Sequence, residues 1–352
     1  MAQLPTVKDV ARVANVSRQT VSNVLNSPEI VKEATRTRVL AAIGELGYRP
    51  HASARRLRTQ KSSTIGIRLE PVRNGISGSV LDTFLHALTE QADRRGMRVL
   101  LFTADDAAAE IEQIRRLRDG ADVDAFVLTS TSYQDARVEW LIENDVPFAT
   151  FGRPWGTEDN PDPRHLWVDV DGRAGVSEAT RHLLDGGAQA VAYIGWPSGS
   201  GAGDDRHRGW REALEERGLA SGDLHVAVED SVANGRAAAE QLLSGARRPD
   251  AIVCASDTLA LGARLAASAA GLDDLPIIGF DNTPVAEAVG LSSISQPLEG
   301  VAAGVLELLL GPTGNSVRKR GEFNEEPTSR LLAPRLVERR STHLALDENT
   351  GL

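Results

Sequence analysis

Side chains that can recognise nucleic-acid bases are concentrated near the N-terminus, in the segment SRQTVSNVLN. Arg18 can donate two hydrogen bonds to guanine, and the amide groups of Gln19 and Asn23 can each pair with adenine. Thr20 and Ser22 carry short hydroxyls, which suit phosphate oxygens that fix register without reading sequence. The segment therefore has side chains for both the bases and the backbone of a nucleic acid.

Short helices are expected to position these side chains. Apolar residues at spacings of three and four predict helices over 6–14, 17–26 and 33–46, with Thr6 and Ser17 as N-terminal caps of the first two. Such a unit is typical of a helix-turn-helix, whose second helix lies in the major groove of DNA. The alternative is a three-helix protein-interaction module with a solvated polar face.

The charge distribution favours DNA as the partner of this N-terminal unit. Residues 1–61 contain 11 basic and 4 acidic side chains, a net charge of +7, whereas the remainder contains 28 basic and 45 acidic side chains, a net charge of −17. A polyanion is attracted to the first part and repelled by the second.

After Ser63, strand-like apolar runs alternate with amphipathic helix-like runs, which predicts parallel βαβ units arranged in two lobes. The predicted strands are 65–69, 97–103, 124–130, 146–151, 190–196, 224–229, 250–256 and 275–280. The predicted helices are 80–95, 107–119, 134–144, 172–186, 207–218, 234–245 and 257–271. The Pro-rich loop 153–165 is the expected first crossing between the lobes.

The N-terminal sequences VKDVARVANVSRQTVSNVLN and RVLAAIGELGYRPHASARRLRTQKSSTIGI closely resemble the LacI family (LacI/GalR type) of bacterial transcriptional regulators. The resemblance continues to APRLVERRST. It implies a small all-α helix-turn-helix headpiece and an α/β two-lobed, periplasmic-binding-protein-like core with parallel sheets. The implied boundaries are a headpiece at 1–49, a hinge helix and linker at 50–63, a core at 64–342 with later crossings near 290–296 and 327–333, and a tail at 343–352.

The resemblance also implies a homodimer that binds palindromic operator DNA. In the family, hinge helices insert a leucine into the minor groove, and Leu57 occupies that position. The residues expected to contact DNA are Thr6, Ser17, Arg18, Gln19, Thr20, Ser22, Asn23, Asn26, Ala54, Arg55, Leu57 and Arg58. Asn23 stands where many relatives carry arginine, which leaves the base preference of the operator open.

A small effector is expected in the cleft between the lobes. Arg206 in DDRHRGW and Asp281 in IIGFDN match the ligand-binding arginine and aspartate of the family. Ser256, Glu70 and Gln296 match other positions that line this cleft. Trp155, Trp167 and Trp196 offer aromatic faces for a sugar ring, with burial in a lobe or dimer interface as the alternative for each.

The sequence predicts a regulator whose effector is a sugar, with a nucleobase effector, or a sugar-binding protein without a regulatory role, as alternatives. Enzyme motifs are absent: the Gly-rich segment WPSGSGAGDDR has Asp204 where a dinucleotide fingerprint needs glycine, and no metal-ligand spacing occurs. We therefore expect no catalytic residues, metal or cofactor. The single cysteine, Cys254, excludes an internal disulfide, and the lack of a signal peptide or membrane span favours a cytoplasmic protein.

Overall fold

The computed structural model of the protein describes residues 5–48, 61–69, 78–156, 162–310, 314, 316–318 and 327–342. The chain divides into two compact units, residues 1–62 and residues 63–352. Most of the predicted hinge segment, 50–63, lies outside the described residues.

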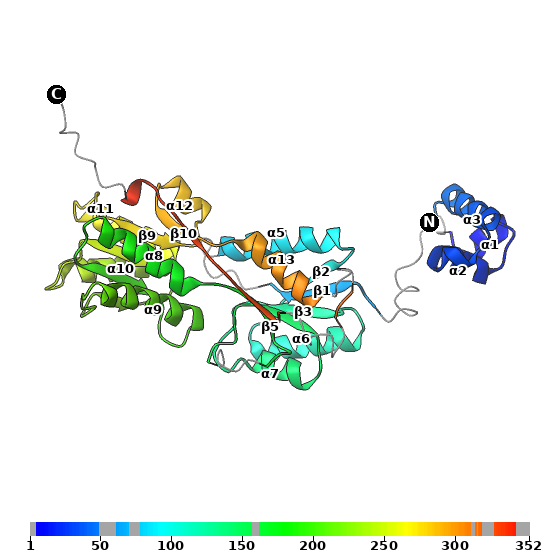
Figure 1. Ribbon diagram of the computed structural model, residues 1–352, viewed down its shortest axis with the longest axis horizontal. Helices are drawn as coiled ribbons and strands as arrows, with labels where there is room; N and C mark the ends of the chain where they lie inside the picture. The colour runs from blue at the N-terminus through cyan, green and yellow to red at the C-terminus, as the bar shows by residue number, and fades with distance from the viewer. Residues whose placement is uncertain are drawn as a thin grey trace, which may run out of the picture. The chain divides into compact units, whose positions relative to one another are not determined.

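The N-terminal unit is the predicted three-helix headpiece (Figure 1). It contains α1 (Val7–Val13), α2 (Arg18–Asn26), the short 3-10 helix η1 (Pro28–Ile30) and α3 (Glu33–Leu46). Val10, Val21 and Val39, one from each α-helix, are fully buried and form the centre of its core. Gly47 ends α3 with φ at 61°, a left-handed conformation that glycine adopts without strain.

The first lobe of the large unit is built on a sheet with strand order β11-β5-β4-β3-β1-β2, in which the described pairs are parallel. Its strands are β1 (Thr64–Arg68), β2 (Arg98–Phe102), β3 (Ala125–Leu128), β4 (Phe148–Phe151), β5 (Leu166–Val170) and β11 (Ser329–Leu332). Its helices are α5 (Gly78–Arg94), α6 (Ala107–Asp119), α7 (Ala136–Glu143) and α13 (Leu298–Leu309).

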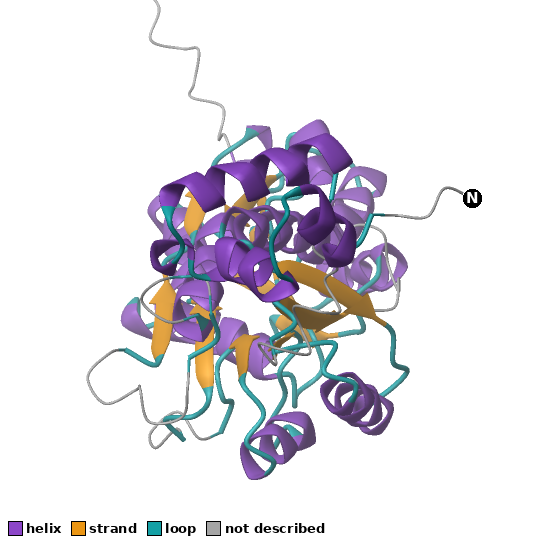
Figure 2. Ribbon diagram, turned by 90° about the vertical axis from the view of Figure 1, so that its right-hand side faces the viewer, coloured by secondary structure: helices purple, strands orange, loops and turns teal. Residues whose placement is uncertain are grey.

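Alternate residues of β3 show how helices cover both faces of this sheet. Ala125 and Val127 pack in a cluster with residues of α5 and α13, whereas Phe126 and Leu128 pack with residues of α6 and α7. Successive strand side chains point to opposite faces, so each face has its own apolar layer. Figure 2 shows the strands in orange and the helices in purple.

The second lobe repeats this plan with strand order β12-β10-β9-β8-β6-β7. Among the described pairs of this sheet, only β10 with β12 is antiparallel. Its strands are β6 (Val191–Gly195), β7 (His225–Ala227), β8 (Ala251–Cys254), β9 (Ile277–Phe280), β10 (Ser292–Ser295) and β12 (Arg335–Val337). Its helices are α8 (Gly172–Asp185), α9 (Gly201–Glu216), α10 (Val232–Ser244), α11 (Asp257–Ala269), α12 (Pro284–Ala288) and the 3-10 helix η2 (Arg340–Thr342).

The predicted first crossing between the lobes, at 153–165, is wrong. This loop joins β4 to β5, which are neighbours in one sheet, and the chain leaves the first lobe only after Val170. The strand β5 was not predicted, because Asp169 interrupts its apolar run LWVDV. The later passages lie between β10 and α13 and between β11 and β12.

Candidate functional site

The polar face of α2 carries the side chains with base-reading chemistry. Ser17 caps the helix, since its Oγ accepts a hydrogen bond of 3.0 Å from the Thr20 backbone N–H. Arg18 and Gln19 are exposed, and Gln19 donates from Nε2 to Asn23 Oδ1 at 2.9 Å. The two amides therefore lie one helical turn apart on the same face and orient each other.

The remaining residues expected to contact DNA are placed to different degrees. Thr6 precedes α1, and its backbone N–H and hydroxyl donate to the Asp9 carboxylate at 3.0 and 2.7 Å. Ser22 is half-buried in α2, and Asn26 is the last residue of that helix. Four positions lie outside the described residues: Ala54, Arg55, Leu57 and Arg58.

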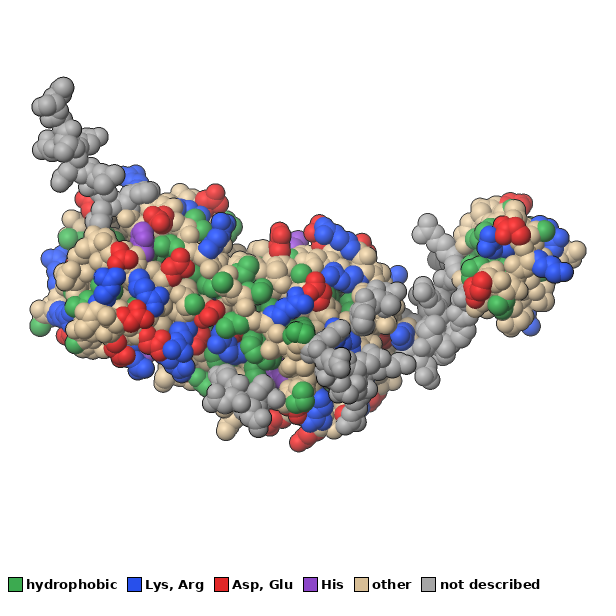
Figure 3. Space-filling model, viewed as in Figure 1, with side chains coloured by type: hydrophobic (Ala, Val, Ile, Leu, Met, Phe, Trp, Pro, Cys, Tyr) green, Lys and Arg blue, Asp and Glu red, His purple; other side chains and the backbone are tan. Residues whose placement is uncertain are grey.

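The surface of the large unit differs from that of a DNA-binding face. On the side shown in Figure 3, acidic and basic side chains are interspersed over this unit. The positive charge counted in residues 1–61 therefore has no counterpart on this side of the large unit.

A cavity of about 220 Å³ lies between the two lobes of the large unit. It is surrounded by residues that follow strands of both sheets at their carboxyl ends, the position where open α/β sheets bind ligands. The polar and aromatic residues that line it are Thr129, Ser130, Thr131, Phe151, Trp155, Asp169, Trp196, Asp205, Arg206, Asp281 and Gln296.

The cavity brings together five of the eight residues predicted to bind the effector: Trp155, Trp196, Arg206, Asp281 and Gln296. Glu70 lies outside the described residues. Two others are placed elsewhere.

Trp167 and Ser256 do not line the cavity. Trp167 lies within β5 and pairs in register with Thr150 and Ser329 on the neighbouring strands. Ser256 is fully buried, caps α11 by accepting a hydrogen bond from the Leu259 N–H, and donates to Asp230. Its place in the fold is that of a helix cap.

Arg206 is held in the cavity wall by aromatic and polar contacts. Its guanidinium lies 3.6 Å from the ring centre of Phe280 and 5.0 Å from that of Trp196. One Nη donates to the Ala255 carbonyl at 2.6 Å, and the other lies 3.9 Å from Asp281 Oδ1. These contacts fix the position of the arginine in the cavity wall.

Asp281 is an unusual carboxylate in two respects. Burial raises its pKa to about 7, against the attraction of Arg206 and the hydrogen bond of 2.7 Å from Gln296 Nε2. Its φ of 108° is rare for a residue with a side chain, and its N–H is fixed by the Ile294 carbonyl at 2.8 Å. Backbone strain of this kind is concentrated at ligand sites.

Two further carboxylates line the cavity, Asp169 and Asp205, and both pair with Arg153; none of the three was predicted from the sequence. Arg153 Nε donates to Asp169 Oδ2 at 2.7 Å, and an Nη lies 3.5 Å from Asp205 on α9 of the other lobe. Burial raises the pKa of both carboxyls. Arg153 and Asp169 belong to no motif quoted above, and Asp205 lies in DDRHRGW beside the predicted Arg206, so only the fold shows that these three residues meet.

Trp155 is packed between the lobes. Its indole N–H donates to Thr131 Oγ1 at 3.1 Å, and the Arg153 guanidinium lies 4.7 Å from its ring centre. A Cβ on Gly201, at the start of α9, would lie only 2.1 Å from Trp155 Cγ. The indole therefore closes against the other lobe where only glycine leaves room, and it is 6% exposed.

The predicted start of α9, at residue 207, is wrong. The helix begins at Gly201 and is capped by Ser200, whose Oγ accepts a hydrogen bond from the Gly203 N–H. Glycine has poor helix propensity, which concealed the first turn. The structural reason for the glycines is packing, because a Cβ on Gly203 would also crowd the Trp196 ring at 3.2 Å.

The described residues lack two further kinds of feature. They contain no group of three or more His, Cys, Asp or Glu side chains arranged to hold a metal ion. They also contain no helix that is long and apolar enough to cross a membrane.

The fold and cavity define a two-lobed ligand-binding core joined in one chain to a helix-turn-helix unit. Residues 6–51 match the bacterial regulatory proteins of the lacI family, and residues 180–342 match the periplasmic binding protein-like domain. The chain is 33% identical to the HTH-type transcriptional regulator CelR of Thermobifida fusca, over 96% of this chain and 98% of the relative. The protein belongs to the LacI family and is an effector-responsive, DNA-binding transcriptional regulator.

Solved structures agree with this assignment. A LacI-family regulatory protein from Chloroflexus aggregans is 34% identical, with a TM-score of 0.71 over 80% of this chain and 98% of that protein. A CelR–cellobiose complex is 29% identical, with a TM-score of 0.68 over 96% of this chain and 99% of that protein.

Proposed function

We propose that the protein is a homodimeric repressor whose affinity for a palindromic operator is changed by a sugar bound in the inter-lobe cavity. The observation that carries this proposal is the joint occurrence of Arg206 and Asp281, with Trp196, in a cavity at the strand ends. In this proposal the helix-turn-helix unit binds the operator, and the cavity binds the effector that changes operator affinity.

The chemistry of the cavity favours a neutral polyhydroxylated ligand. Three carboxyl groups (Asp169, Asp205, Asp281) offer acceptors for sugar hydroxyls, and Arg206 offers donors. Arg153 does not line the cavity but pairs with Asp169 and Asp205. The formal charges of these five groups sum to −1, so an anionic effector would gain little. Trp196 provides an apolar ring face at the wall. The cellobiose held by the similar CelR supports the same class of ligand.

The effector acts by binding one arrangement of the lobes more tightly than another. Contacts that cross the cavity, Arg153 with Asp205 and Trp155 with Gly201, belong to the arrangement seen here. A ligand that strengthens or breaks these contacts shifts the equilibrium between the arrangements of the lobes. The affinity for the operator changes because the arrangements differ in it. A dimer is needed because one headpiece reads only a few base pairs.

The test uses the full chain and a duplex operator selected from a random library by the purified protein. Thermal unfolding with cellobiose, maltose, sucrose, glucose and galactose identifies the sugar, and fluorescence anisotropy then measures operator binding with and without it. We expect one sugar to raise the Tm and change operator affinity. R206A should lose both responses and still bind the operator.

Two results would overturn the proposal. If the protein selects no specific duplex from the library, the proposed operator binding is wrong. Stabilisation by adenine or guanine, with no response to any of the five sugars, would replace the sugar by a nucleobase.

A further inference from the structure

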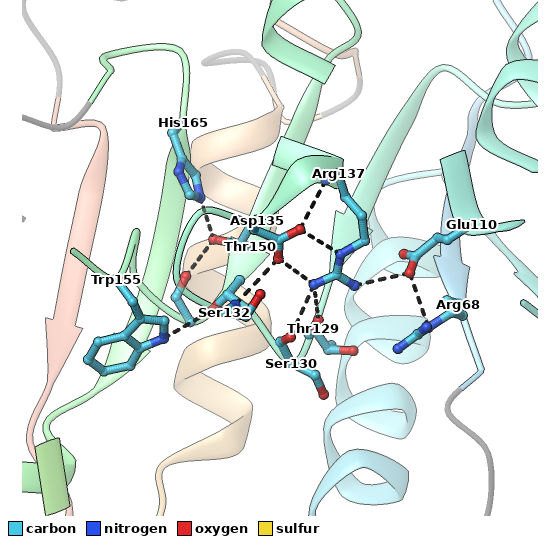
Figure 4. A network of polar contacts seen from close by, with 12 residues as sticks. Arg68, Glu110, Thr129, Ser130, Ser132, Asp135, Arg137, Thr150, Trp155 and His165 are labelled. Atoms are coloured by element: carbon cyan, nitrogen blue, oxygen red, sulfur yellow. Dashed lines mark hydrogen bonds and ion pairs between the residues drawn. The ribbon is translucent and has the colours of Figure 1, made fainter. Parts of the chain in front are cut away.

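A cluster of buried charges lies in the first lobe, and no part of the proposed function uses it (Figure 4). Arg137 on α7 donates from Nη1 to Glu110 Oε2 at 3.0 Å and from Nε and Nη2 to the Asp135 carboxylate at 2.9 and 2.6 Å. Glu110, on α6, also pairs with Arg68 at 3.2 Å. Arg137 is 4% exposed and Glu110 is 1% exposed.

Arg137 also holds the backbone at the end of β3. Its Nη2 donates to the carbonyl oxygens of Thr129 and Ser130, at 3.2 and 3.0 Å. These two residues line the cavity. The segment they begin has left-handed backbone at Ser130, with φ at 53°, and at Gln134, with φ at 50°. Such conformations persist where the surroundings fix them.

The same segment carries the contact that holds Trp155. Thr131 Oγ1 accepts the indole N–H at 3.1 Å and lies 3.3 Å from the Arg153 carbonyl oxygen. We propose that Arg137 is a positioning residue for the effector cavity: it fixes segment 129–135 so that Thr129 and Ser130 form the wall and Thr131 holds Trp155. The inference rests on the proposed function where it concerns sugar affinity.

A stabilising role alone would not explain the choice of arginine. Buried ion pairs are often no more stable than apolar side chains of similar volume, because both charges lose their hydration. Only a guanidinium has enough fixed donors to reach Asp135, Glu110 and two backbone carbonyls at once. The carboxylates of Glu110 and Asp135 hold the guanidinium of Arg137, and this guanidinium in turn holds the backbone of the cavity wall.

The discriminating experiment compares R137M, R137K and E110Q in the full chain by hydrogen–deuterium exchange without ligand. R137M removes the donors to the Thr129 and Ser130 carbonyls. R137K keeps the positive charge but lacks the planar guanidinium whose donors reach all the partners at once. E110Q removes the charge of Glu110 but leaves a side-chain oxygen that can accept from Arg137 Nη1, so the guanidinium and its donors to Thr129 and Ser130 are kept. We expect exchange in segment 129–135 to rise about tenfold in both Arg137 variants and to stay near wild type in E110Q.

Trp155 gives a second measurement, because its indole is held by the positioned segment. Acrylamide should quench tryptophan fluorescence more strongly in R137K than in wild type, and the increase should vanish when W155F is added. Whichever of the five sugars the wild type binds should bind R137K about tenfold more weakly, with operator affinity retained.

Equal exchange in E110Q and R137K, or unchanged exchange at 129–135 in R137K, would overturn the inference. Failure of every sugar to bind the wild type would overturn the proposed function alone, since exchange and quenching are measured without ligand.

Discussion

Asp281 lines the cavity, and its carboxyl group is costly to ionise there. Its pKa is raised from 3.8 to about 7 because burial removes water from the charged form. The folded state therefore retains a proton that the unfolded chain releases above pH 3.8, so this residue makes the folded state less stable as the pH rises towards 7.

The D281N variant tests this linkage. Asparagine can still accept the Gln296 hydrogen bond but does not ionise. The free energy of unfolding of D281N minus that of wild type should increase between about pH 4 and 7, by at most ~4 kcal/mol, and level off above. Urea unfolding across this range measures it. A difference independent of pH would refute the raised pKa, since Asp257 and the other carboxyls are common to both proteins.

The contact between Trp155 and Gly201 gives a second prediction at the residue scale. G201A places a methyl group within the indole and should cost about 1–3 kcal/mol of stability through overpacking. In a W155A background the same change should cost less than ~0.5 kcal/mol, because the obstacle is gone. Urea unfolding of the four proteins gives the coupling. Equal costs in both backgrounds would show that the contact does not hold the lobes.

Among single residues, those in local motifs could be predicted from the sequence, and those paired across the fold could not. Arg206 and Asp281 lie in short recognisable segments and line the cavity. Asp169 is a single acidic residue in β5, and Asp205 follows Asp204 in α9 beside Arg206, so the sequence does not show which of these carboxylates lines the cavity. Trp196 follows the apolar run AVAYIG, whereas Trp167 lies within LWVDV, and only the fold shows that Trp196 lines the cavity and Trp167 does not.

At the scale of elements, capping and periodicity predicted the headpiece helices, whereas buried elements of the core were missed. The helix α13, with the sequence LEGVAAGVLELL, is apolar on most sides, and only Glu299 and Glu307 carry charge. It packs on α5 and on the first sheet, which explains its composition. Fully buried helices give a weaker sequence signal than half-exposed ones.

Two roles of Ser17, as the N-terminal cap of α2 and as a contact with DNA, can be tested separately. S17A loses the hydrogen bond to the Thr20 N–H and should weaken α2 by about 0.5–2 kcal/mol. S17D keeps an acceptor at the cap and suits the helix dipole, but places a negative charge next to phosphate. We expect S17D to preserve amide protection in α2 and to lose operator affinity. Hydrogen exchange and anisotropy measure the two effects, and full operator binding by S17D would place Ser17 away from the DNA backbone.

At the scale of the whole molecule, the N-terminal part of the chain is basic and the part that contains the effector cavity is acidic. Residues 1–61 carry +7 and the remainder carries −17. Operator affinity should therefore fall by about 10³–10⁵ between roughly 50 and 200 mM salt if each dimer makes about 6–10 phosphate contacts. Sugar affinity, measured by calorimetry over the same range, should change less than about twofold, because a neutral ligand releases no counterions. A steep salt dependence of effector binding would indicate an anionic effector.

The order of the strands has a consequence for synthesis of the protein. The first lobe needs α13 and β11, which lie more than a hundred residues after β5, and the second lobe needs β12. During translation the headpiece emerges first and can fold as a unit, but the first lobe lacks a strand until residue 332 has been made, and the second lobe until residue 337. A nascent or truncated chain therefore presents a DNA-binding unit without a completed sensor, so control by the effector begins only when the last strands are in place.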